Sequence, residues 1–451
     1  MRNVVIVSCV LWTLGGCVFE KVCVNGAARD ASGMCVAMGA VRDSGADAGL
    51  DGGGTDANID GMTSDTDGGT DDGGTDGGGR GRITQFSVGV AHVCAVDSLG
   101  TLRCWGSNLF GQLASGDIMA IAAPRVIDLS GPVSSVTGSA LGVCAQTSAP
   151  ALFCWGQENE GQVGDGALSD IPVTTPFEHK GLSARHVASG ATNTCVTNPL
   201  GTLVCWGRND RGQLGLGTTG SPQPAPGALM RYDGMMPVEN VAATAIGDRH
   251  VCMRTNDNRV ACVGSNETGE LGLGDRTSRN YAEQVPGMTA VTSLSAAASH
   301  VCIVNGGDVY CWGDNDEGQA GAVIGVFDSP TLVAGTSGAI AVATGDIATC
   351  ALLNMRKVVC WGKRTRGGIG DGTPVSDMIV SVPVTVPELV DVVAIGSSFL
   401  DVFCALTGSG ELYCWGEDAT SRLGPPDPLA ATVFLDGMQL HTGPVRVNPL
   451  P

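Results

Sequence analysis

Aromatic and basic residues are the two classes in which this sequence is poorest. Aromatic side chains make up 4% of the chain, and 25 Lys and Arg stand against 45 Asp and Glu, for a formal net charge of −20. A surface that binds DNA or chromatin requires a basic patch, so the charge balance argues against a nucleic-acid partner. Long windows of the sequence also lack the 3.6-residue periodicity of amphipathic helices, which excludes a mainly helical fold.

The chain is, by contrast, rich in cysteine and glycine, with 18 Cys and 68 Gly. One arrangement occurs seven times: a Cys, eight or nine residues, and a second Cys that leads into Trp-Gly in every copy but one. Its period of roughly 50 residues is typical of repeat architectures. The seven pairs are Cys94 with Cys104, Cys144 with Cys154, Cys195 with Cys205, Cys252 with Cys262, Cys302 with Cys311, Cys350 with Cys360 and Cys404 with Cys414.

Each cysteine pair flanks a short turn between two apolar, β-branched runs, a pattern that predicts a β-hairpin. Facing Cβ atoms of an antiparallel pair lie about 4.5–5.5 Å apart, which is close to the spacing that a disulfide needs. We therefore expect each pair to form a disulfide across its own hairpin. Zinc binding is the alternative, but the Cys-x2–4-Cys spacing of structural zinc sites is missing.

A Gly- and Asn-rich loop follows Trp-Gly, most completely at residues 207–217, and a Pro/Val segment such as residues 124–126 comes next. Proline fits an outer edge strand, where its missing N–H does no harm. Four short strands in each repeat, without helices, predict an all-β fold. The expected architecture is a seven-bladed β-propeller of four-stranded blades, each with a hairpin disulfide.

The first repeat has no Pro/Val segment of its own before Gly89, whereas residues 443–447 at the C-terminus form such a segment without a following repeat. We therefore expect residues 443–447 to close the ring as the outer strand of the blade that contains Cys94 and Cys104.

The repeat resembles that of the regulator of chromosome condensation family, which reads Gly-x-x-His-x-x-Ala-Leu and then Gly-x-Val-Tyr-x-Trp-Gly-x-Asn-x-x-Gly-Gln-Leu-Gly. The resemblance extends over residues 83–451 and is best in residues 190–217 and 247–275. The fourth repeat departs from the pattern, since Val263 stands where Trp is expected. The resemblance implies a propeller that binds other molecules, here in the form of a bacterial exported lipoprotein.

Six of the seven tryptophans lie in Cys-Trp-Gly, where we expect them to pack between blades: Trp105, Trp155, Trp206, Trp312, Trp361 and Trp415. His92, His250 and His300 could suggest a metal site, because equivalent positions of the blades converge around the axis. The family resemblance implies a structural role for them instead. We expect no metal, no cofactor and no catalytic residue.

Residues 1–16 contain Arg2 and a short apolar run over residues 4–14, which is typical of a secretory signal peptide and too short to span a membrane. The residues Leu-Gly-Gly before Cys17 resemble a bacterial lipobox, which predicts acylation of Cys17, with palmitate among the chains. The alternative is an ordinary signal peptide followed by an unmodified Cys. The expected location is the bacterial cell envelope, with a lipid anchor in the outer membrane or at the cell surface.

The remaining cysteines pair evenly once Cys9 is removed with the signal and Cys17 is acylated, with Cys23 and Cys35 as the eighth pair. Even pairing is typical of an oxidising compartment. Residues 17–38 are thus interpreted as the lipidated Cys and a small disulfide loop.

Residues 39–82 are rich in Asp, Gly and Thr and have too few apolar residues for a core, which predicts a disordered linker. Calcium binding by its Asp-x-Asp-Gly sequence is the alternative, but an EF-hand starting at Asp65 would lack its Gly and its Glu. Residues 83–451 are interpreted as the propeller, with repeats starting near 89, 138, 190, 247, 297, 345 and 396.

The hypothesis we favour is a membrane-anchored binding or scaffold propeller that presents variable loops to a protein or glycan partner. One alternative is an exported enzyme inhibitor, because the family includes secreted propellers that inhibit β-lactamase. Another is a glycan-processing enzyme, but sialidase chemistry needs a Tyr nucleophile and the chain has 4 Tyr, two of which (Tyr310 and Tyr413) precede a hairpin Cys. Nucleotide exchange on a Ran-type GTPase disagrees with export and with the acidic charge.

Overall fold

The computed structural model describes residues 81–119, 121–149, 151–228, 236–321, 324–418, 432–435 and 438–447, together with two short strands near the N-terminus. Those strands, β1 (Ala28–Arg29) and β2 (Cys35–Val36), pair antiparallel, with Arg29 opposite Cys35. Cys17, Cys23, the signal peptide and nearly all of the linker lie outside the described residues. Their assignments therefore stay predictions.

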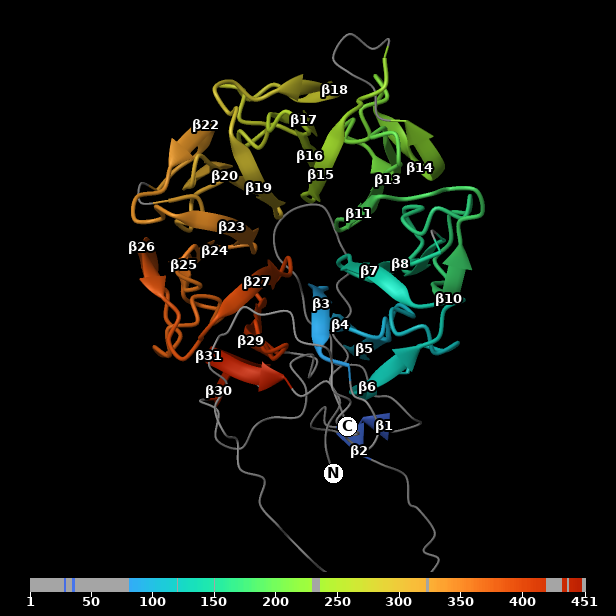
Figure 1. The fold of residues 1–451 in the computed structure, drawn as a ribbon, viewed down its shortest axis with the longest axis horizontal. Coiled ribbons are helices and arrows are strands. Elements are labelled where there is room, and N and C mark those ends of the chain that lie inside the picture. The colour runs from blue at the N-terminus through green and yellow to red at the C-terminus, as the bar shows by residue number, and fades with distance from the viewer. Residues whose placement is uncertain are drawn as a thin grey trace, which may run out of the picture. The chain divides into compact units, whose positions relative to one another are not determined.

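Seven antiparallel sheets follow one another along the chain and surround a central space, as Figure 1 shows. This confirms the seven-bladed propeller. Blades one to three are β3 (Ile83–Val88), β4 (His92–Asp97), β5 (Leu102–Gly106), β6 (Ile121–Ile127); β7 (Val133–Gly138), β8 (Gly142–Thr147), β9 (Leu152–Gly156), β10 (Val173–Glu178); β11 (His186–Ser189), β12 (Asn193–Thr197), β13 (Leu203–Asn209), β14 (Gly220–Ala228).

The remaining blades repeat the same order, and blade seven has a fifth strand at its outer edge. Their strands are β15 (Val241–Ile246), β16 (His250–Thr255), β17 (Val260–Gly264), β18 (Arg279–Gln284); β19 (Val291–Ala296), β20 (His300–Asn305), β21 (Asp308–Gly313), β22 (Phe327–Leu332); β23 (Ala339–Thr344), β24 (Ala348–Leu353), β25 (Val358–Lys363), β26 (Ile379–Thr385); β27 (Val392–Ser397), β28 (Phe403–Thr407), β29 (Leu412–Glu417), β30 (Thr432–Leu435), β31 (Met438–Val447).

The two middle strands of every blade place their cysteines directly opposite each other, and each facing pair forms a disulfide with a Cα–Cα distance of 4.1 Å. The hairpin disulfides expected from the spacing are thus present in each blade. They join Cys94 to Cys104, Cys144 to Cys154, Cys195 to Cys205, Cys252 to Cys262, Cys302 to Cys311, Cys350 to Cys360 and Cys404 to Cys414.

The spacing of the fifth pair is one residue shorter than that of the other six. Cys302 and Cys311 are 9 positions apart in the sequence, whereas Cys144 and Cys154 are 10 apart. The hairpin of blade five absorbs the difference in its turn, because Asn305 and Asp308 still pair and Cys302 still faces Cys311. The register of the cysteines therefore does not depend on the length of the turn.

Over the described residues, no helix is long and apolar enough to cross a bilayer.

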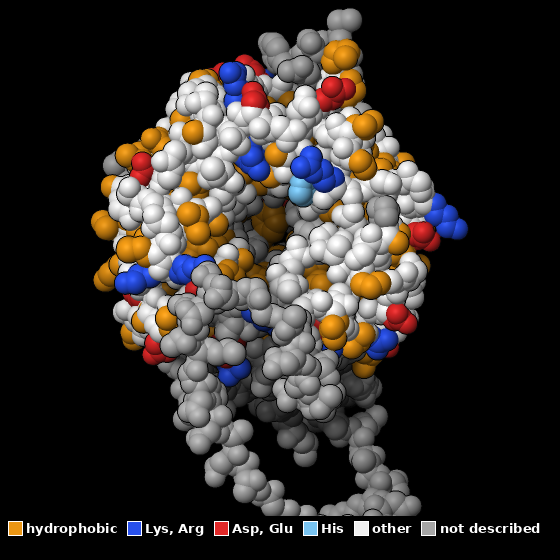
Figure 2. Space-filling model, in the orientation of Figure 1, with side chains coloured by type: hydrophobic (Ala, Val, Ile, Leu, Met, Phe, Trp, Pro, Cys, Tyr) orange, Lys and Arg blue, Asp and Glu red, His pale blue; other side chains and the backbone are white. Residues whose placement is uncertain are grey.

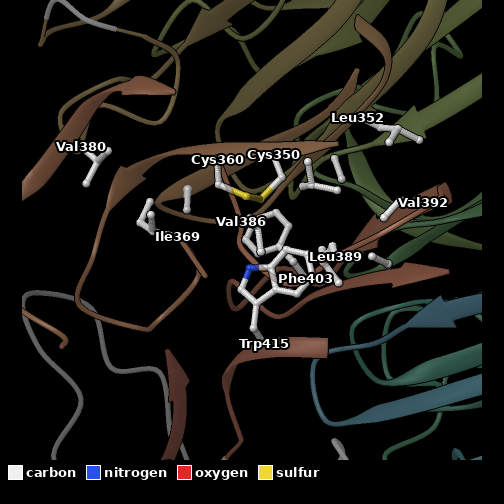
Figure 3. Close-up of a cluster of buried hydrophobic side chains, with 14 residues drawn as sticks. Cys350, Leu352, Cys360, Ile369, Val380, Val386, Leu389, Val392, Phe403 and Trp415 are labelled. Atoms are coloured by element: carbon white, nitrogen blue, oxygen red, sulfur yellow. A yellow bond between two sulfur atoms is a disulfide. The ribbon is translucent and has the colours of Figure 1, made fainter. Parts of the chain in front are cut away.

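The core consists of seven apolar clusters, one in each seam between neighbouring blades. Each cluster contains cysteines of one blade and the Trp of the next, or Val263 in the seam between blades three and four. Figure 3 shows this contact for the disulfide of Cys350 with Cys360 and for Trp415. Phe403 stacks on Trp415 there, with ring centroids 6.1 Å apart. The tryptophans therefore join the blades to one another.

The expected closure of the ring by residues 443–447 is wrong. The outer strand of blade one is β6, from its own repeat, and β31 pairs with β29 as the outer strand beside Cys404 and Cys414. The error came from starting each repeat at the Gly-x-x-His motif, because the innermost strand of each blade precedes that motif. Every blade is therefore formed by consecutive strands.

Blades one and seven meet through side chains instead of a shared sheet. The cluster in their seam includes Trp105, Cys404 and Cys414. Phe86 lies so close to Gly396 that a Cβ added there would be 3.0 Å from the Phe86 ring. Apolar packing therefore covers the contact between the first and last blades.

A single blade disulfide is expected to stabilise the propeller by roughly 3 kcal/mol in the chain-entropy model. Urea unfolding of the double variant Cys195→Ser/Cys205→Ser should therefore show a free energy of unfolding lower by about that amount. The single variant Cys195→Ser serves as the comparison, because it leaves an unpaired buried thiol. Equal stability of wild type and double variant would contradict the expected role of the bond.

Candidate functional site

The two faces of the propeller are formed by different connections. On one face, the loop after Trp-Gly begins beside the turn before the first Cys strand, as the 2.8 Å bond from Ser107 N–H to the Ala91 carbonyl shows. On the other, the hairpin turn between the Cys strands meets the start of the next blade, where Val133 N–H donates to the Gly100 carbonyl at 2.8 Å. We call these the loop face and the turn face.

In the first five blades, two buried side chains fix the loop on the loop face. In blades one, three, four and five, an Asn accepts a hydrogen bond through Oδ1 from the N–H five residues later, at 2.8, 3.2, 2.9 and 2.7 Å. A Gln or Glu then accepts from the N–H two residues before it. These residues are Asn108, Asn209, Asn266 and Asn315, with Gln112, Gln162, Gln213, Glu270 and Gln319. Hydrogen bonds to buried side chains thereby fix the conformation of the loop backbone.

The blade tryptophans also hold these loops. Trp155 Nε1–H donates to the Gln112 carbonyl of the preceding blade at 2.9 Å, and Trp206 does the same to Gln162 at 2.9 Å. Trp312, Trp361 and Trp415 make the matching bonds in later seams. All six blade tryptophans are buried. The expected packing role is therefore accompanied by a second role, which the sequence pattern did not reveal.

The buried Asn, Gln or Glu and Trp residues described above form a framework beneath the loops. The tips of the loops differ in chemistry although this framework is similar in the first five blades. The residue after the framework Asn position is exposed in each of the first five blades. These residues are Leu109, Asn159, Asp210, Glu267 and Asp316. A constant framework with variable, exposed tips is what a recognition surface on a rigid scaffold requires.

The histidines of the Gly-x-x-His motif, His92, His250 and His300, are buried. An added Cβ on Gly247 would lie 2.1 Å from His250 Cε1, so the imidazole fills the space that the glycine leaves. Burial lowers the pKa of His250 to about 4 and that of His300 to about 3. His300 Nε2 lies 3.0 Å from Thr349 Oγ1 of the next blade. Within the described residues, no three His, Cys, Asp or Glu side chains are grouped to hold a metal ion.

Asp401 takes the place of the missing histidine in blade six, where Ala348 occupies the His position. Its Oδ1 accepts hydrogen bonds from the N–H groups of Ile347 and Ala348 at 2.9 and 3.0 Å. A Cβ on Gly345 would lie 2.3 Å from that oxygen. Arg366 Nη1 lies 3.1 Å from Oδ2. Asp401 of blade seven thus fills the space that a histidine of the same blade fills elsewhere. An alignment of the repeats could not reveal this, because Asp401 belongs to the following repeat.

Glu158 replaces the framework Asn in blade two. It is 1% exposed, and Oε2 accepts from Val163 N–H at 2.7 Å, while Oε1 has no partner among the described residues. Burial, with a contribution from the nearby charge of Asp165, raises the pKa of Glu158 to about 8. This carboxyl group is therefore protonated at neutral pH in the folded protein.

The innermost strands β3, β7, β11, β15, β19, β23 and β27 line a central channel of about 280 Å³ near the loop face. Each of them contributes a Ser or Thr to the lining, namely Ser87, Thr137, Ser189, Thr244, Ser295, Thr344 and Ser397. Some of these hydroxyls join blades, since Ser295 Oγ accepts from Thr344 N–H at 3.1 Å and Ser397 Oγ donates to the Thr344 carbonyl at 2.7 Å.

Comparisons with known proteins agree with this arrangement. A model of the regulator of chromosome condensation (RCC1) repeat matches residues 83–112, 184–213 and 291–319, and a second model of the same repeat matches residues 201–253. The ultraviolet-B receptor UVR8 of Arabidopsis thaliana is 27% identical over 355 residues, which are 76% of this chain and 79% of that protein.

Solved structures share the fold at low sequence identity. Human WBSCR16 has a TM-score of 0.66 and 20% identity, and the match covers 77% of this chain and 94% of that one. Prp20p of Saccharomyces cerevisiae, characterised for its binding properties to Gsp1p and histones, has a TM-score of 0.60 and 21% identity over 70% of this chain and 80% of its own. These two likenesses concern the fold alone.

Glu158→Gln should stabilise the protein at alkaline pH. The folded pKa of about 8 lies above the ordinary value of 4.5, so the folded state holds a proton that the unfolded state releases. The contribution of Glu158 to stability therefore falls as the pH rises from 4.5 to 8. The variant should be more stable than wild type by roughly 1–3 kcal/mol at pH 9 and close to it at pH 4.5, in urea unfolding. Glu160→Gln, at the tip of the same loop, is the control, and an equal gain there would refute the assignment.

Proposed function

We propose that this chain, which belongs to the regulator of chromosome condensation repeat family, is a binding or scaffold protein whose loop face recognises a protein partner. Relatives with this propeller bind proteins, as Prp20p does with Gsp1p and histones. The observation that carries the proposal is the set of buried residues, mostly Asn, Gln and Trp, that holds the loops of the first five blades in the same way beneath tips that differ from blade to blade.

The loops of blades one and two supply the hydrophobic part of this surface. Five large apolar side chains are exposed there: Leu109 at 45%, Ile118 at 50%, Met119 at 69%, Leu168 at 52% and Ile171 at 78%. The loop of blade one contacts β10, the outer strand of blade two that follows the second loop, since Gly116 N–H donates to the Thr174 carbonyl at 3.0 Å. Contiguous exposed apolar groups with a polar surround are typical of protein interaction sites.

The charge of the chain supports a protein over a nucleic acid as the partner. A net charge of −20 repels the phosphate backbone, whose neutralisation by Lys and Arg supplies most of the affinity of DNA-binding proteins. We propose a binding role without catalysis, and a protein partner over a glycan because the exposed side chains of these loops are aliphatic.

Ser substitutions at Met119 and Ile171 should remove most of the apolar contact without disturbing the core, because both side chains are exposed. With the full-length protein as bait for solubilised cell envelope, we expect at least tenfold lower capture of the partner by the double variant than by wild type. Leu99→Ser/Leu200→Ser, two exposed leucines of the turn face, is the matched control and should capture as wild type does. Equal capture by all three proteins would contradict a loop-face site.

We further propose that Cys17 is acylated and anchors the protein to the membrane of a bacterial cell envelope. The short apolar run and the lipobox-like residues before Cys17 support this proposal. Two or more acyl chains anchor a protein stably, whereas one is marginal.

Cys17→Ser should therefore move the protein from the membrane fraction to the soluble fraction on ultracentrifugation. Mass spectrometry of the wild-type N-terminal peptide should show the lipid on Cys17. A soluble wild-type chain with an unmodified N-terminus would overturn the anchor and leave the loop-face site unaffected.

A further inference from the structure

The seam between blades three and four differs from the other six. Each innermost strand directs one side chain toward the preceding blade, and it is apolar in six blades: Phe86, Val136, Val187, Leu294, Val342 and Ile395. In β15 the residue at this position is Thr244. The same seam has Val263 where the others have Trp. A cavity of about 270 Å³ lies between β11 and β15, lined by His186, Val187, Ala188, Ala242, Ala243 and Thr244.

In three of the other seams a side chain makes a hydrogen bond between neighbouring innermost strands, and the described residues show no such bond between β11 and β15. Gln85 Oε1 accepts from Val136 N–H at 3.1 Å, and Ser293 Oγ accepts from Val342 N–H at 3.2 Å. His186 occupies the register position of Gln85 and Ser293, two residues before the residue that faces the first Cys. Its ring lines the cavity instead.

A buried hydroxyl in this cavity lacks a partner. Thr244 Oγ1 is inaccessible and makes no hydrogen bond within the described part of the chain. Ser189 Oγ, in the adjoining channel, is in the same condition. Unpaired buried hydroxyls cost stability, so replacing Thr244 by an apolar residue is not expected to destabilise this seam.

The charges of two guanidinium groups, those of Arg185 and Arg254, act on the imidazole of His186 at the turn-face end of this seam. Arg185 precedes His186 and is exposed with it. Partial burial and then the charges of Arg185 and Arg254 lower the pKa of His186. Arg254 Nη1 donates to Asn258 Oδ1 at 2.9 Å, and neither arginine has a carboxylate partner among the ion pairs of the described residues. Figure 2 shows basic side chains and a histidine gathered next to the central hollow, over β11 and β15.

Unpaired arginines are unusual in a chain with a net charge of −20, since acidic groups are abundant elsewhere on it. Arginine binds carboxylates in a bidentate geometry. The cavity beside it is lined by small residues, among them Ala188, whose methyl group packs in this seam, and it can accept a small aliphatic group. A polar rim over an apolar cavity is typical of a small-ligand site.

We propose that the seam between blades three and four binds a carboxylate attached to a small aliphatic group, with the aliphatic part in the cavity and the carboxylate beside His186 and Arg185. Two sources share this chemistry, a free short-chain acid and the C-terminal residue of a polypeptide. Inorganic phosphate lacks the aliphatic part and would leave the apolar walls empty. The site lies at the turn-face end of the seam, so it does not depend on the loop-face proposal.

Titration of the full-length protein with N-acetyl-L-valine tests the site, with calorimetry or ligand-observed NMR as the readout. We expect saturable binding that is at least tenfold weaker for N-acetyl-L-valinamide, which has no carboxylate. Arg185→Gln should weaken binding of the acid at least tenfold. Thr244→Leu should abolish binding of the acid, because the larger side chain fills the cavity. Leu294 has the same position in blade five, so the variant should keep the melting temperature of wild type. Arg125→Gln, an exposed arginine of β6, is the control and should bind as wild type does.

A pentapeptide that ends in a free Val carboxylate distinguishes the two sources. Binding at least tenfold tighter than that of N-acetyl-L-valine assigns the site to a polypeptide C-terminus, and equal affinity assigns it to a free acid. The proposal is overturned if neither compound binds saturably, if the amide binds as tightly as the acid, or if Thr244→Leu binds as wild type does.

Discussion

The contact between the disulfide of one blade and the indole of the next is the interaction on which the rest of the propeller depends. It requires that the two middle strands pair with their cysteines opposite each other, because only this register directs the following Trp toward the neighbouring seam. Sulfur and aromatic surfaces attract each other, and the buried indole contributes a large apolar area. The indole N–H then binds the loop carbonyl of the preceding blade, so one side chain connects core packing to the loop face.

This arrangement separates stability from recognition. Blade disulfides, tryptophans and framework Asn and Gln residues lie beneath the surface, whereas the exposed loop tips carry no part of the core. Substitutions at the tips can therefore change what is bound without unfolding the scaffold. The acidic charge of the chain fits such a surface when the partner is a protein.

Positions where a blade departs from the repeat have local physical consequences. Glu158 in the Asn position leaves a carboxyl oxygen without a partner among the described residues, and Ala348 in the His position is compensated by Asp401 from the next blade. Thr244 and Val263 lie on the same side of blade four, and together they leave the seam with blade three less filled than the others.

The repeat, the hairpin register and the disulfide pairing could all be predicted from the sequence, because they depend on residues about ten positions apart whose geometry a hairpin fixes. It also indicated which tryptophans pack between blades. The closure of the ring could not be predicted in this way, since the sequence pattern of β31 fits the outer strand of the first blade as well as that of the last, to which it pairs. The replacement of a histidine by Asp401 and the cavity beside His186 likewise bring together residues some 50 positions apart, and their contacts exist only once neighbouring blades have packed.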